Sequence, residues 1–288
     1  MSAFIPWNSQ AIDVWGEQHA EGQFIDLGGR RTHYVERGEG QPVVLIHGFN
    51  LDWHTWMRNI DHLAANFKVY AIDLWGQGYS TREPLNYGYD LFEKQLRLFM
   101  EVMNLQKTSL VGHSMGAGTS ITFALRNREK VNKLVLVDSA GIPVTLPFRS
   151  KVFRMKGVAE FLLSLRTDMI RRMNLGDFWI HNMEAVTNSD YEKLTGYQKV
   201  AGSHEAVLSI LRKDFFNTLE DEIVELGKLN ISTLIIWGRQ DNSLPFNSGE
   251  KMHQVMPSSK LEILEEAGHL ANFDQAESFN ELVTNFLS

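Results

Sequence analysis

The chain has 288 residues, of which 43% are hydrophobic and 22% are charged, a composition typical of a globular protein with a large core. Its formal net charge is −7 and it has no long basic run, so we expect no nucleic-acid partner, because phosphate contacts need clustered Lys and Arg. The absence of cysteine excludes disulfides, thiolate metal sites and a cysteine nucleophile. The first 26 residues contain no Lys or Arg and no apolar segment typical of a signal peptide, and no run approaches the roughly 18 apolar residues of a membrane span, so we expect a cytoplasmic protein.

The first half of the chain predicts short strands that alternate with helices. Two strands at 23–27 and 31–36, joined by Gly28-Gly29, form a predicted hairpin. The apolar run 42–46 is typical of a strand buried on both faces, and it ends at His47-Gly48. Further along, strands are expected at 69–72, 109–111 and 134–137, and helices at 53–67, 89–103 and 117–125.

The second half interrupts this alternation and then resumes it. Helical patterns rich in Met and aromatic residues follow one another without a strand, at 152–165, 168–173, 191–200 and 205–216. Beyond them, the chain predicts strands at 233–237 and 261–264 and helices at 246–256 and 276–287. The alternation outside the interruption predicts a parallel sheet with helices on both faces. We therefore predict a core made of 1–142 and 218–288, and an inserted helical cap, 143–217, over the ends of the strands.

The most informative motif is Gly112-His113-Ser114-Met115-Gly116, which stands between a predicted strand and a predicted helix. The glycines remove the Cβ atoms that would clash in so tight a turn, so the serine is held in a strained conformation with its Oγ projecting outward. This geometry suits a nucleophile. Because the five-residue pattern alone matches many proteins by chance, its meaning depends on the other residues that reach the same edge of the sheet.

Polar residues are expected at the carboxyl ends of the strands, where a parallel sheet binds its ligands. They are His47, Asp73, Ser114, Asp138, Asp241 and His269. A serine nucleophile needs a base to take its proton, and the base needs an acid to orient it. The chain order Ser114, Asp241, His269 is the order expected of such a triad in one large fold of this type. We predict Ser114 as the nucleophile, Asp241 as the acid and His269 as the base.

Three other polar side chains near these positions receive different predictions. Asp138 is the competing candidate for the acid, although Asp241 is favoured. Asp73 is expected to hold its loop by accepting backbone hydrogen bonds, and His113 is expected to point away from the nucleophile and to pack. No two histidines have convincing metal-ligand spacing beside a carboxylate, so we predict no metal site.

Two backbone amides are predicted to bind the oxyanion of a tetrahedral intermediate, which needs two donors. The first is the N–H of Met115, directly after the predicted nucleophile. The second is the N–H of Phe49, which follows His47-Gly48 at the end of an earlier predicted strand. The tight turn after this strand is the same structure that would form the oxyanion hole. The structural and the catalytic interpretation of His47-Gly48 therefore do not exclude each other.

Five segments that span nearly the whole chain share a pattern with one large superfamily. They are His47-Gly48-Phe49, Asp73-x-x-Gly76-x-Gly78-x-Ser80, the elbow at Ser114, Gly238-Arg239-x-Asp241 with Pro245, and Gly268-His269. Together they resemble the α/β-hydrolase superfamily, in its branch of serine carboxylesterases and meta-cleavage hydrolases with a helical cap. The resemblance implies an α/β fold with a mostly parallel eight-stranded sheet, helices on both faces, an inserted helical cap, and hydrolysis without a cofactor.

The same resemblance narrows the reaction. Epoxide hydrolases and haloalkane dehalogenases of this superfamily need a carboxylate nucleophile, whereas this chain has Ser114. Meta-cleavage hydrolases usually carry Gly-Asn-Ser-Met-Gly at the elbow, Gly-Pro-Gly after the early His-Gly, and Trp after the final Gly-His. This chain has His113, Phe49-Asn50-Leu51 and Leu270 at those positions. These departures favour a carboxylic ester hydrolase that acts through an acyl-enzyme.

Two alternatives stay open beside the ester hydrolase. One is a hydrolase of the carbon–carbon bond in meta-cleavage-type diketones, and the other is a non-catalytic ligand-binding protein of the same fold. The complete triad favours an enzyme. The Met and aromatic residues of the cap predict an apolar pocket for a small uncharged substrate, a short or medium acyl or aryl ester. The sequence makes no prediction about the oligomeric state.

Overall fold

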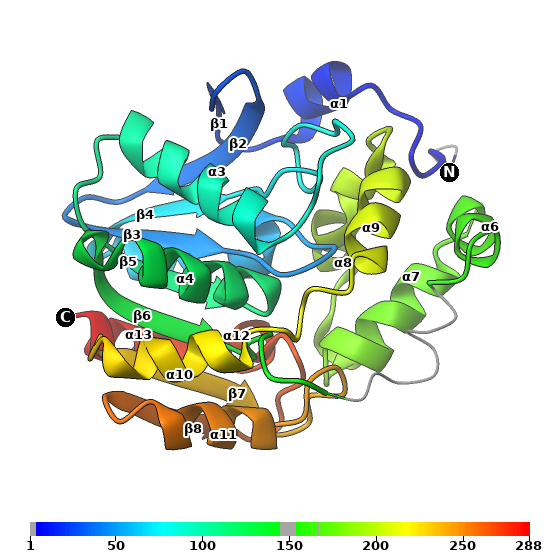
Figure 1. The fold of residues 1–288 in the computed structure, drawn as a ribbon. Helices are drawn as coiled ribbons and strands as arrows, with labels where there is room; N and C mark the ends of the chain where they lie inside the picture. The colour runs from blue at the N-terminus through cyan, green and yellow to red at the C-terminus, as the bar shows by residue number, and fades with distance from the viewer. Residues whose placement is uncertain (1–3, 145–153, 166) are drawn as a thin grey trace.

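The computed structural model of the chain, which describes residues 4–144, 154–165 and 167–288, is built around one sheet of eight strands (Figure 1). The order across the sheet is β1-β2-β4-β3-β5-β6-β7-β8. The strands are β1 (Gln23–Asp26), β2 (Arg31–Arg37), β3 (Gln41–Ile46), β4 (Phe67–Ile72), β5 (Thr108–His113), β6 (Val131–Val137), β7 (Thr233–Gly238) and β8 (Ser259–Leu264). β2 pairs antiparallel with β1 and with β4, and the other pairs are parallel. The predicted fold class is confirmed.

The hairpin at the start of the sheet depends on its two turn glycines. Gly28 and Gly29 have φ angles of 66° and 84°, in a region that residues with a Cβ rarely enter. The Asp26 carboxylate accepts a hydrogen bond from the Gly29 N–H at 2.8 Å and closes the turn. The register then places Gln23 opposite Tyr34, as the predicted hairpin requires.

Helices cover both faces of the sheet and bury its central strands, of which β5 and β7 are buried along their whole length. Figure 1 shows α3 (Tyr89–Val102), α4 (Met115–Arg126), α10 (Glu220–Lys228) and α11 (Asn247–Val255) on the near face. Their apolar side chains form one core cluster with the strands, and those of α2 (Ile60–Ala64) and α13 (Ala276–Leu287) form a second on the opposite face. Burial on both faces explains why the central strands appear in the sequence as unbroken apolar runs.

The described residues between β6 and β7 contain helices and no strand, as the pattern predicts. Before α10 they are α6 (Val158–Ser164), α7 (Met169–Asn174), α8 (Asn188–Thr195) and α9 (Ser203–Arg212). These helices lie beyond the carboxyl ends of the parallel strands, on the right in Figure 1. The first two residues of the predicted helix 152–165 lie outside the described residues.

Several element boundaries differ from the prediction for reasons that lie in tertiary contacts. The predicted helix 53–67 is instead a 3-10 turn (Trp53–Trp56) followed by the short α2. The N–H of Trp53, at the start of this turn, donates to Asp73 at 2.8 Å and ties the turn to the loop after β4. Helices α1 (Ile12–His19) and α10 were not predicted. Helix α1 is held by Trp15, which packs against residues distant in the chain.

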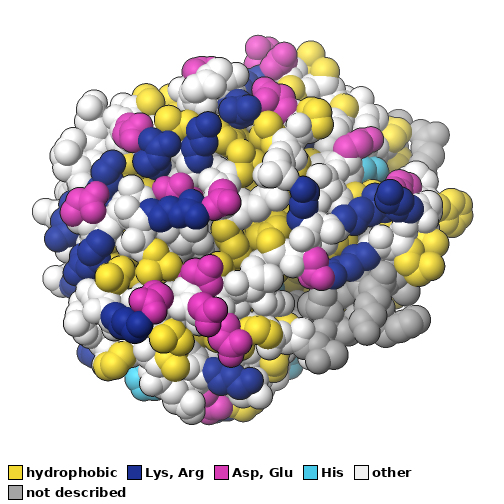
Figure 2. All heavy atoms as spheres, viewed as in Figure 1, with side chains coloured by type: hydrophobic (Ala, Val, Ile, Leu, Met, Phe, Trp, Pro, Cys, Tyr) yellow, Lys and Arg dark blue, Asp and Glu magenta, His cyan; other side chains and the backbone are white. Residues whose placement is uncertain are grey.

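The outer surface carries side chains of both charges. On the face seen in Figure 2, acidic and basic side chains are interspersed over the core helices rather than gathered by sign. Among the helices that the structure describes, none combines the length and the hydropathy that crossing a bilayer would need. The cytoplasmic location stays a prediction.

Candidate active site

Ser114 occupies a strained turn between β5 and α4. Its φ and ψ are 52° and −116°, outside the regions that L residues prefer. The turn needs its two glycines, because a Cβ on Gly112 would lie 2.5 Å from the carbonyl oxygen of Gly116, and one on Gly116 would lie 2.1 Å from that of Ile46. The backbone therefore holds the Ser114 hydroxyl at the first turn of α4, where the helix dipole favours negative charge.

The three residues predicted as a triad come together at the ends of three different strands. His269 Nε2 lies 2.9 Å from Ser114 Oγ, and His269 Nδ1 lies 2.7 Å from Asp241 Oδ2. The other oxygen of Asp241 accepts hydrogen bonds from the N–H groups of Ser243, at 2.7 Å, and Leu244, at 2.9 Å. The carboxylate is thus held by its own loop and directs one oxygen at the imidazole.

Asp138, the competing candidate for the acid, has another position. Its two oxygens accept hydrogen bonds from the N–H groups of Gly238, at 2.7 Å, and Ala271, at 3.2 Å, so it links the loop of the acid to the loop of the base. Burial, and then the charge of neighbouring Asp241, raises the pKa of Asp138 well above its usual range. The structure places Asp241, and not Asp138, at hydrogen-bond distance from the imidazole.

A metal site was considered at Asp138, Asp241 and His269, because one possible ligand atom from each residue lies within 4.8 Å of the others. Both imidazole nitrogens and all four carboxylate oxygens already have partners within the protein. The donor set is therefore better described as the hydrogen-bonded support of a serine than as a set of free ligands.

His113 is buried and packed, as predicted, but it packs against the base and lines the cavity beside Ser114 instead of pointing away from the nucleophile. Its Nε2 lies 2.7 Å from the carbonyl oxygen of His269, and the centroids of the two rings are 4.8 Å apart. Burial, and then the neighbouring His269, lowers the pKa of His113 well below its usual value. A neutral ring whose Nε2–H donates to the His269 carbonyl satisfies this geometry.

The loop after β3 is held against the elbow by a buried polar network. His47 Nε2 accepts a hydrogen bond from the Leu74 N–H at 2.9 Å, and its Nδ1 lies 2.7 Å from the carbonyl oxygen of Gly48. A Cβ on Gly48 would lie 3.0 Å from the Cβ of Ser114, so this loop touches the nucleophile turn directly. As predicted, Asp73 holds its own loop, and it accepts from the N–H groups of Trp53 and Tyr79 at 2.8 Å each.

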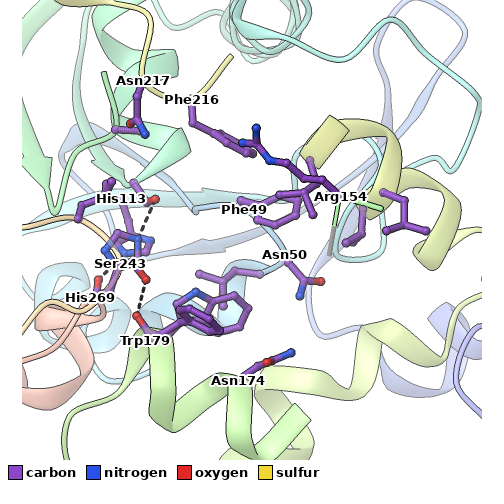
Figure 3. A pocket seen from close by; sticks show the side chains of 18 of the residues that line it. Phe49, Asn50, His113, Arg154, Asn174, Trp179, Phe216, Asn217, Ser243 and His269 are labelled. Carbon is purple, nitrogen blue, oxygen red and sulfur yellow. Dashed lines mark hydrogen bonds between the residues drawn. The ribbon is translucent and has the colours of Figure 1, made fainter. Parts of the chain in front are cut away.

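A cavity of about 190 Å³ opens above Ser114 between the strand ends and the inserted helices (Figure 3). Most of its lining is apolar: Phe49, Leu51, Ala140, Leu163, Phe178, Trp179, Val207, Leu208, Leu211, Phe216 and Leu244. The polar side chains in the lining, apart from Ser114 and the two histidines, are Asn50, Arg154, Asn174, Asn217 and Ser243. The cavity therefore joins the predicted nucleophile and base to helices of the predicted cap.

The polar lining offers several hydrogen-bond donors. Arg154 is the one Arg or Lys among the described lining residues, which include no Asp or Glu. Its Nη2 donates to Asp214 Oδ1 at 2.6 Å, whereas its buried Nε has no partner in the described part of the chain. Asn50 and Asn217 use their carbonyl oxygens to accept from Tyr197 and Gly141, which leaves their amino groups as donors.

The strand order, the elbow and the inserted helices agree with a comparison of the sequence with known families. The family model described as alpha/beta hydrolase fold matches residues 41–276. The chain belongs to this family. The match includes the predicted nucleophile, acid and base, and it begins with β3, the strand that leads to the Phe49 loop.

Several of the similar proteins are meta-cleavage product hydrolases, and the similar structures also include a membrane phospholipase A and a thermophilic esterase. The chain is 29% identical over 275 residues to the 2-hydroxy-6-oxo-6-(2'-aminophenyl)hexa-2,4-dienoic acid hydrolase of Metapseudomonas resinovorans, with 92% of this chain and 90% of that protein covered. It is also 29% identical over 275 residues to the 2-hydroxy-6-oxononadienedioate/2-hydroxy-6-oxononatrienedioate hydrolase of Escherichia coli, with 90% and 91% covered. A solved meta-cleavage product hydrolase from Pseudomonas fluorescens IP01 is similar with a TM-score of 0.80 and 27% identity, with 92% and 97% covered. These findings confirm the resemblance to the meta-cleavage-hydrolase-like branch, and the protein is a hydrolase.

Proposed function

We propose that the protein hydrolyses the carbon–carbon bond beside a ketone in a small meta-cleavage-type diketone that carries a carboxylate. The observation that carries this proposal is a cavity whose described lining contains Ser114, His269 and Arg154 and no Asp or Glu, with Asp241 bonded to His269 behind it. The similar proteins, whose names describe hydrolases of dienoic and dienedioic acids, support carbon–carbon cleavage ahead of the ester cleavage that the sequence favoured.

In this proposal the first half-reaction forms an acyl-enzyme. His269 takes the proton of Ser114 Oγ as that oxygen adds to the ketone carbon, and Asp241 holds the tautomer of the imidazole and stabilises the imidazolium. The N–H groups of Phe49 and Met115 stabilise the oxyanion. Met115 is the first residue of α4, so its N–H has no acceptor within the helix.

Collapse of the tetrahedral intermediate then breaks the carbon–carbon bond. The electron pair of that bond moves onto the leaving carbon, where conjugation with the second carbonyl of the substrate spreads the charge. The imidazolium of His269 returns its proton to this fragment, which departs. Water, deprotonated by His269, next adds to the ester carbonyl of acyl-Ser114 and releases a carboxylic acid. The sum of the steps is one substrate and one water converted to two products, with no oxidant, reductant or cofactor.

Arg154 is proposed to bind the carboxylate of the substrate. An arginine donates through five N–H groups, and its unpaired, buried Nε supplies one that the described residues do not use. The described lining adds no Asp or Glu beside Arg154, whose Nη2 pairs with Asp214 outside the lining. The uncharged substrate predicted from the cap composition is therefore replaced in this proposal by a charged one. We also propose that residues 143–217 act as the cap that encloses it.

Hydrolysis of a carboxylic ester is the second candidate, and the lining of the cavity favours it. The lining is mostly apolar, and cleavage of an ester needs no conjugated carbonyl, because the departing alkoxide carries its own charge. The same Ser114, His269 and Asp241 would act, with His269 giving its proton to the alcohol. His113, where meta-cleavage hydrolases usually carry Asn, also favours this candidate.

One comparison of substrates tests the choice. Purified protein is assayed with a 2-hydroxy-6-oxo-dienoic acid and with neutral p-nitrophenyl butyrate, and a higher kcat/KM is expected for the diketone acid. A higher value for the ester would select ester hydrolysis. Failure of a folded protein to turn over either compound, or to react with a fluorophosphonate, would select the ligand-binding alternative.

Substitution of Arg154 separates binding of the substrate carboxylate from the chemical step. Arg154→Gln should raise KM for the diketone acid about tenfold or more, because a hydrogen bond to a charged group contributes about 1.5–3 kcal/mol. KM for p-nitrophenyl butyrate should not change. Arg97→Gln is the matched control, since Arg97 lies on α3 and pairs with Glu101 at 2.8 Å outside the cavity lining. An equal change in KM for both substrates would contradict the role of Arg154 in anion binding.

A further inference from the structure

Residues 178–181, called here the 178–181 segment, connect the inserted helices to both loops that carry the acid and the base. The segment begins in the single-turn π-helix η3 (Leu175–Trp179), a conformation often found at functional sites. Phe178 and Trp179 line the cavity above Ser114. The same few residues therefore line the cavity above Ser114 and contact the loops that carry Asp241 and His269.

On the side of the acid, Ser243 makes the connection. Its Oγ donates to the carbonyl oxygen of Phe178 at 2.6 Å, and its backbone N–H donates to Asp241 Oδ1 at 2.7 Å (Figure 3 shows Ser243 against Trp179). One residue thus bonds both to the acid and to the inserted segment. A displacement of Phe178 would pull on the loop that orients the carboxylate.

On the side of the base, the segment bonds directly to the backbone next to His269. The N–H of Leu270 donates to the carbonyl oxygen of Trp179 at 2.8 Å. A Cβ on Gly268 would lie 2.8 Å from that same oxygen and 2.9 Å from the N–H of His181, so the two chains touch without room for a side chain. The residues on both sides of the base therefore lie against the 178–181 segment.

Asp274 strengthens this contact with one carboxylate oxygen. Its Oδ2 accepts from the N–H of His181 at 2.9 Å and from the N–H of Gly268 at 2.8 Å. The carboxylate bridges the inserted segment and the residue that precedes His269. Hydrogen bonds to an ionised group are the stronger ones, so this bridge fixes the distance between the two backbones.

We propose that the 178–181 segment positions the catalytic residues, with Ser243 and Asp274 as positioning residues that act through Asp241 and His269. Contact of a substrate with Phe178 and Trp179 then biases the alignment of the acid and the base, because both side chains belong to the segment that holds those loops. The proposal rests on the catalytic role proposed for Ser114. A helical insertion that only covered the cavity would need no bonds to these loops.

The rate of covalent labelling by a small fluorophosphonate tests the proposal, since labelling reports the alignment of Ser114 with His269 and needs little contact with the cavity. Ser243→Ala should slow labelling on the order of tenfold, because misplacement of catalytic groups by about 1 Å costs up to about 100-fold in rate. Ser203→Ala is the matched control. Ser203 Oγ accepts from Arg82 Nε at 3.2 Å, a bond between α9 and a core loop away from the triad. It should label at the wild-type rate.

A second pair of variants makes the same test on the side of the base. Asp274→Ala should also slow labelling on the order of tenfold. Asp190→Ala, which removes an ion pair of 3.2 Å between α8 and Arg58, should not. In turnover assays the two positioning variants should lose kcat with KM within about twofold, and Ser243→Thr, which keeps the hydroxyl, should recover kcat.

The outcomes separate this inference from the proposed function. If the wild-type protein labels and Ser243→Ala and Asp274→Ala label like their controls, the positioning role is wrong and the proposed function stands. If the wild-type protein does not label at all, the proposed nucleophile and this inference both fail. Slower labelling of only these two variants, with each variant still folded at the assay temperature, supports the inference.

Discussion

The two sides of the active site differ in what holds their residues in place. Below the cavity, Ser114, Asp241 and His269 stand at the ends of strands whose positions are set by a sheet buried on both faces. Above it, Arg154 and Trp179 come from short helices and turns of the insertion. Trp179 packs on a small apolar cluster and bonds to Leu270, and Arg154 pairs with Asp214. In the proposed function, the residues of the chemical step thus belong to the sheet and the residue that selects the substrate belongs to the insertion, which is a general way for one fold to serve many reactions.

The largest effect is expected from the strand-end nucleophile. Ser114→Ala should lower kcat at least about a thousandfold, because no other group in the triad can form the acyl-enzyme. The fold should remain, since the variant keeps the backbone of the elbow and removes only one oxygen. Steady-state assays and the midpoint of thermal unfolding measure the two properties separately. Undiminished turnover in this variant would show that the lower side does not carry the chemistry.

The two carboxylates near the base should differ strongly in kinetics. Asp241→Asn should lower kcat by about 10⁴-fold, as expected when the acid no longer selects the tautomer of the base. Asp138→Asn should be much milder, because Asp138 bonds to the backbone at Gly238 and Ala271 and not to the imidazole. Kinetic assays of the two variants measure this ranking, and the reverse ranking would move the acid to Asp138.

The pH dependence of stability gives a second measurement on Asp138. Its pKa is raised in the folded protein, so the folded state keeps a proton that the unfolded chain loses. Its contribution to stability is complete below the unfolded pKa of about 3.9 and decreases as the pH rises through the folded value. The unfolding midpoint of the wild type relative to Asp138→Asn should therefore fall as the pH rises. A constant difference between the two would contradict the raised pKa.

A smaller effect is expected at His113, which lies between the two sides. His113→Leu leaves the carbonyl of His269 without its donor, which should cost about 1–3 kcal/mol in the free energy of unfolding. His113→Gln can still donate and should cost less.

The pKa of His113 is lowered in the folded state, so the unfolded chain takes up a proton first. The wild type should therefore lose stability as the pH falls below about 6.5. Denaturant titrations at pH 5 and pH 8 measure this loss of the free energy of unfolding. If His113→Gln loses as much between the two pH values as the wild type, the loss belongs to other titrating groups.

The smallest effect is expected on the outer face of the upper side. Phe161 on α6 is 64% exposed, and hydrophobic side chains gather over this helix at the right-hand edge of Figure 2. Phe161→Ser should change the free energy of unfolding by less than about 0.5 kcal/mol and leave kcat/KM unchanged. A large loss of activity would show that this face, too, takes part in binding the substrate.

The lower side of the site, which carries Ser114, Asp241 and His269 at the strand ends, could be predicted from the sequence because its signals are local. Continuous apolar runs marked the buried strands, and the polar residues that follow them, such as Ser114 and His269, are brought together by the parallel arrangement of the sheet. Gly112 and Gly116 marked the turn at Ser114 locally as well, because neither position has room for a Cβ. These features depend on neighbours in the chain and on one rule of topology.

The upper side could not be predicted in the same way because its contacts join residues that are distant in the chain. The bond between Leu270 and Trp179, and the place of His113 against His269, depend on tertiary distances that no local pattern encodes. In the core, helix α10 was also missed, although it has acidic residues in its first turn and Lys228 in its last, a charge pattern typical of a helix. Arg154 carried no local signal of the cavity that it lines.

Peptide mapping after reaction with a fluorophosphonate tests the catalytic role of Ser114 most directly. The protein is labelled, digested and analysed by mass spectrometry, alongside Ser114→Ala and His269→Ala. A single adduct is predicted on the peptide that contains Ser114. It should be absent from Ser114→Ala and form far more slowly in His269→Ala. An adduct on another residue, or an active enzyme that forms none, would contradict the assignment of Ser114 as the nucleophile.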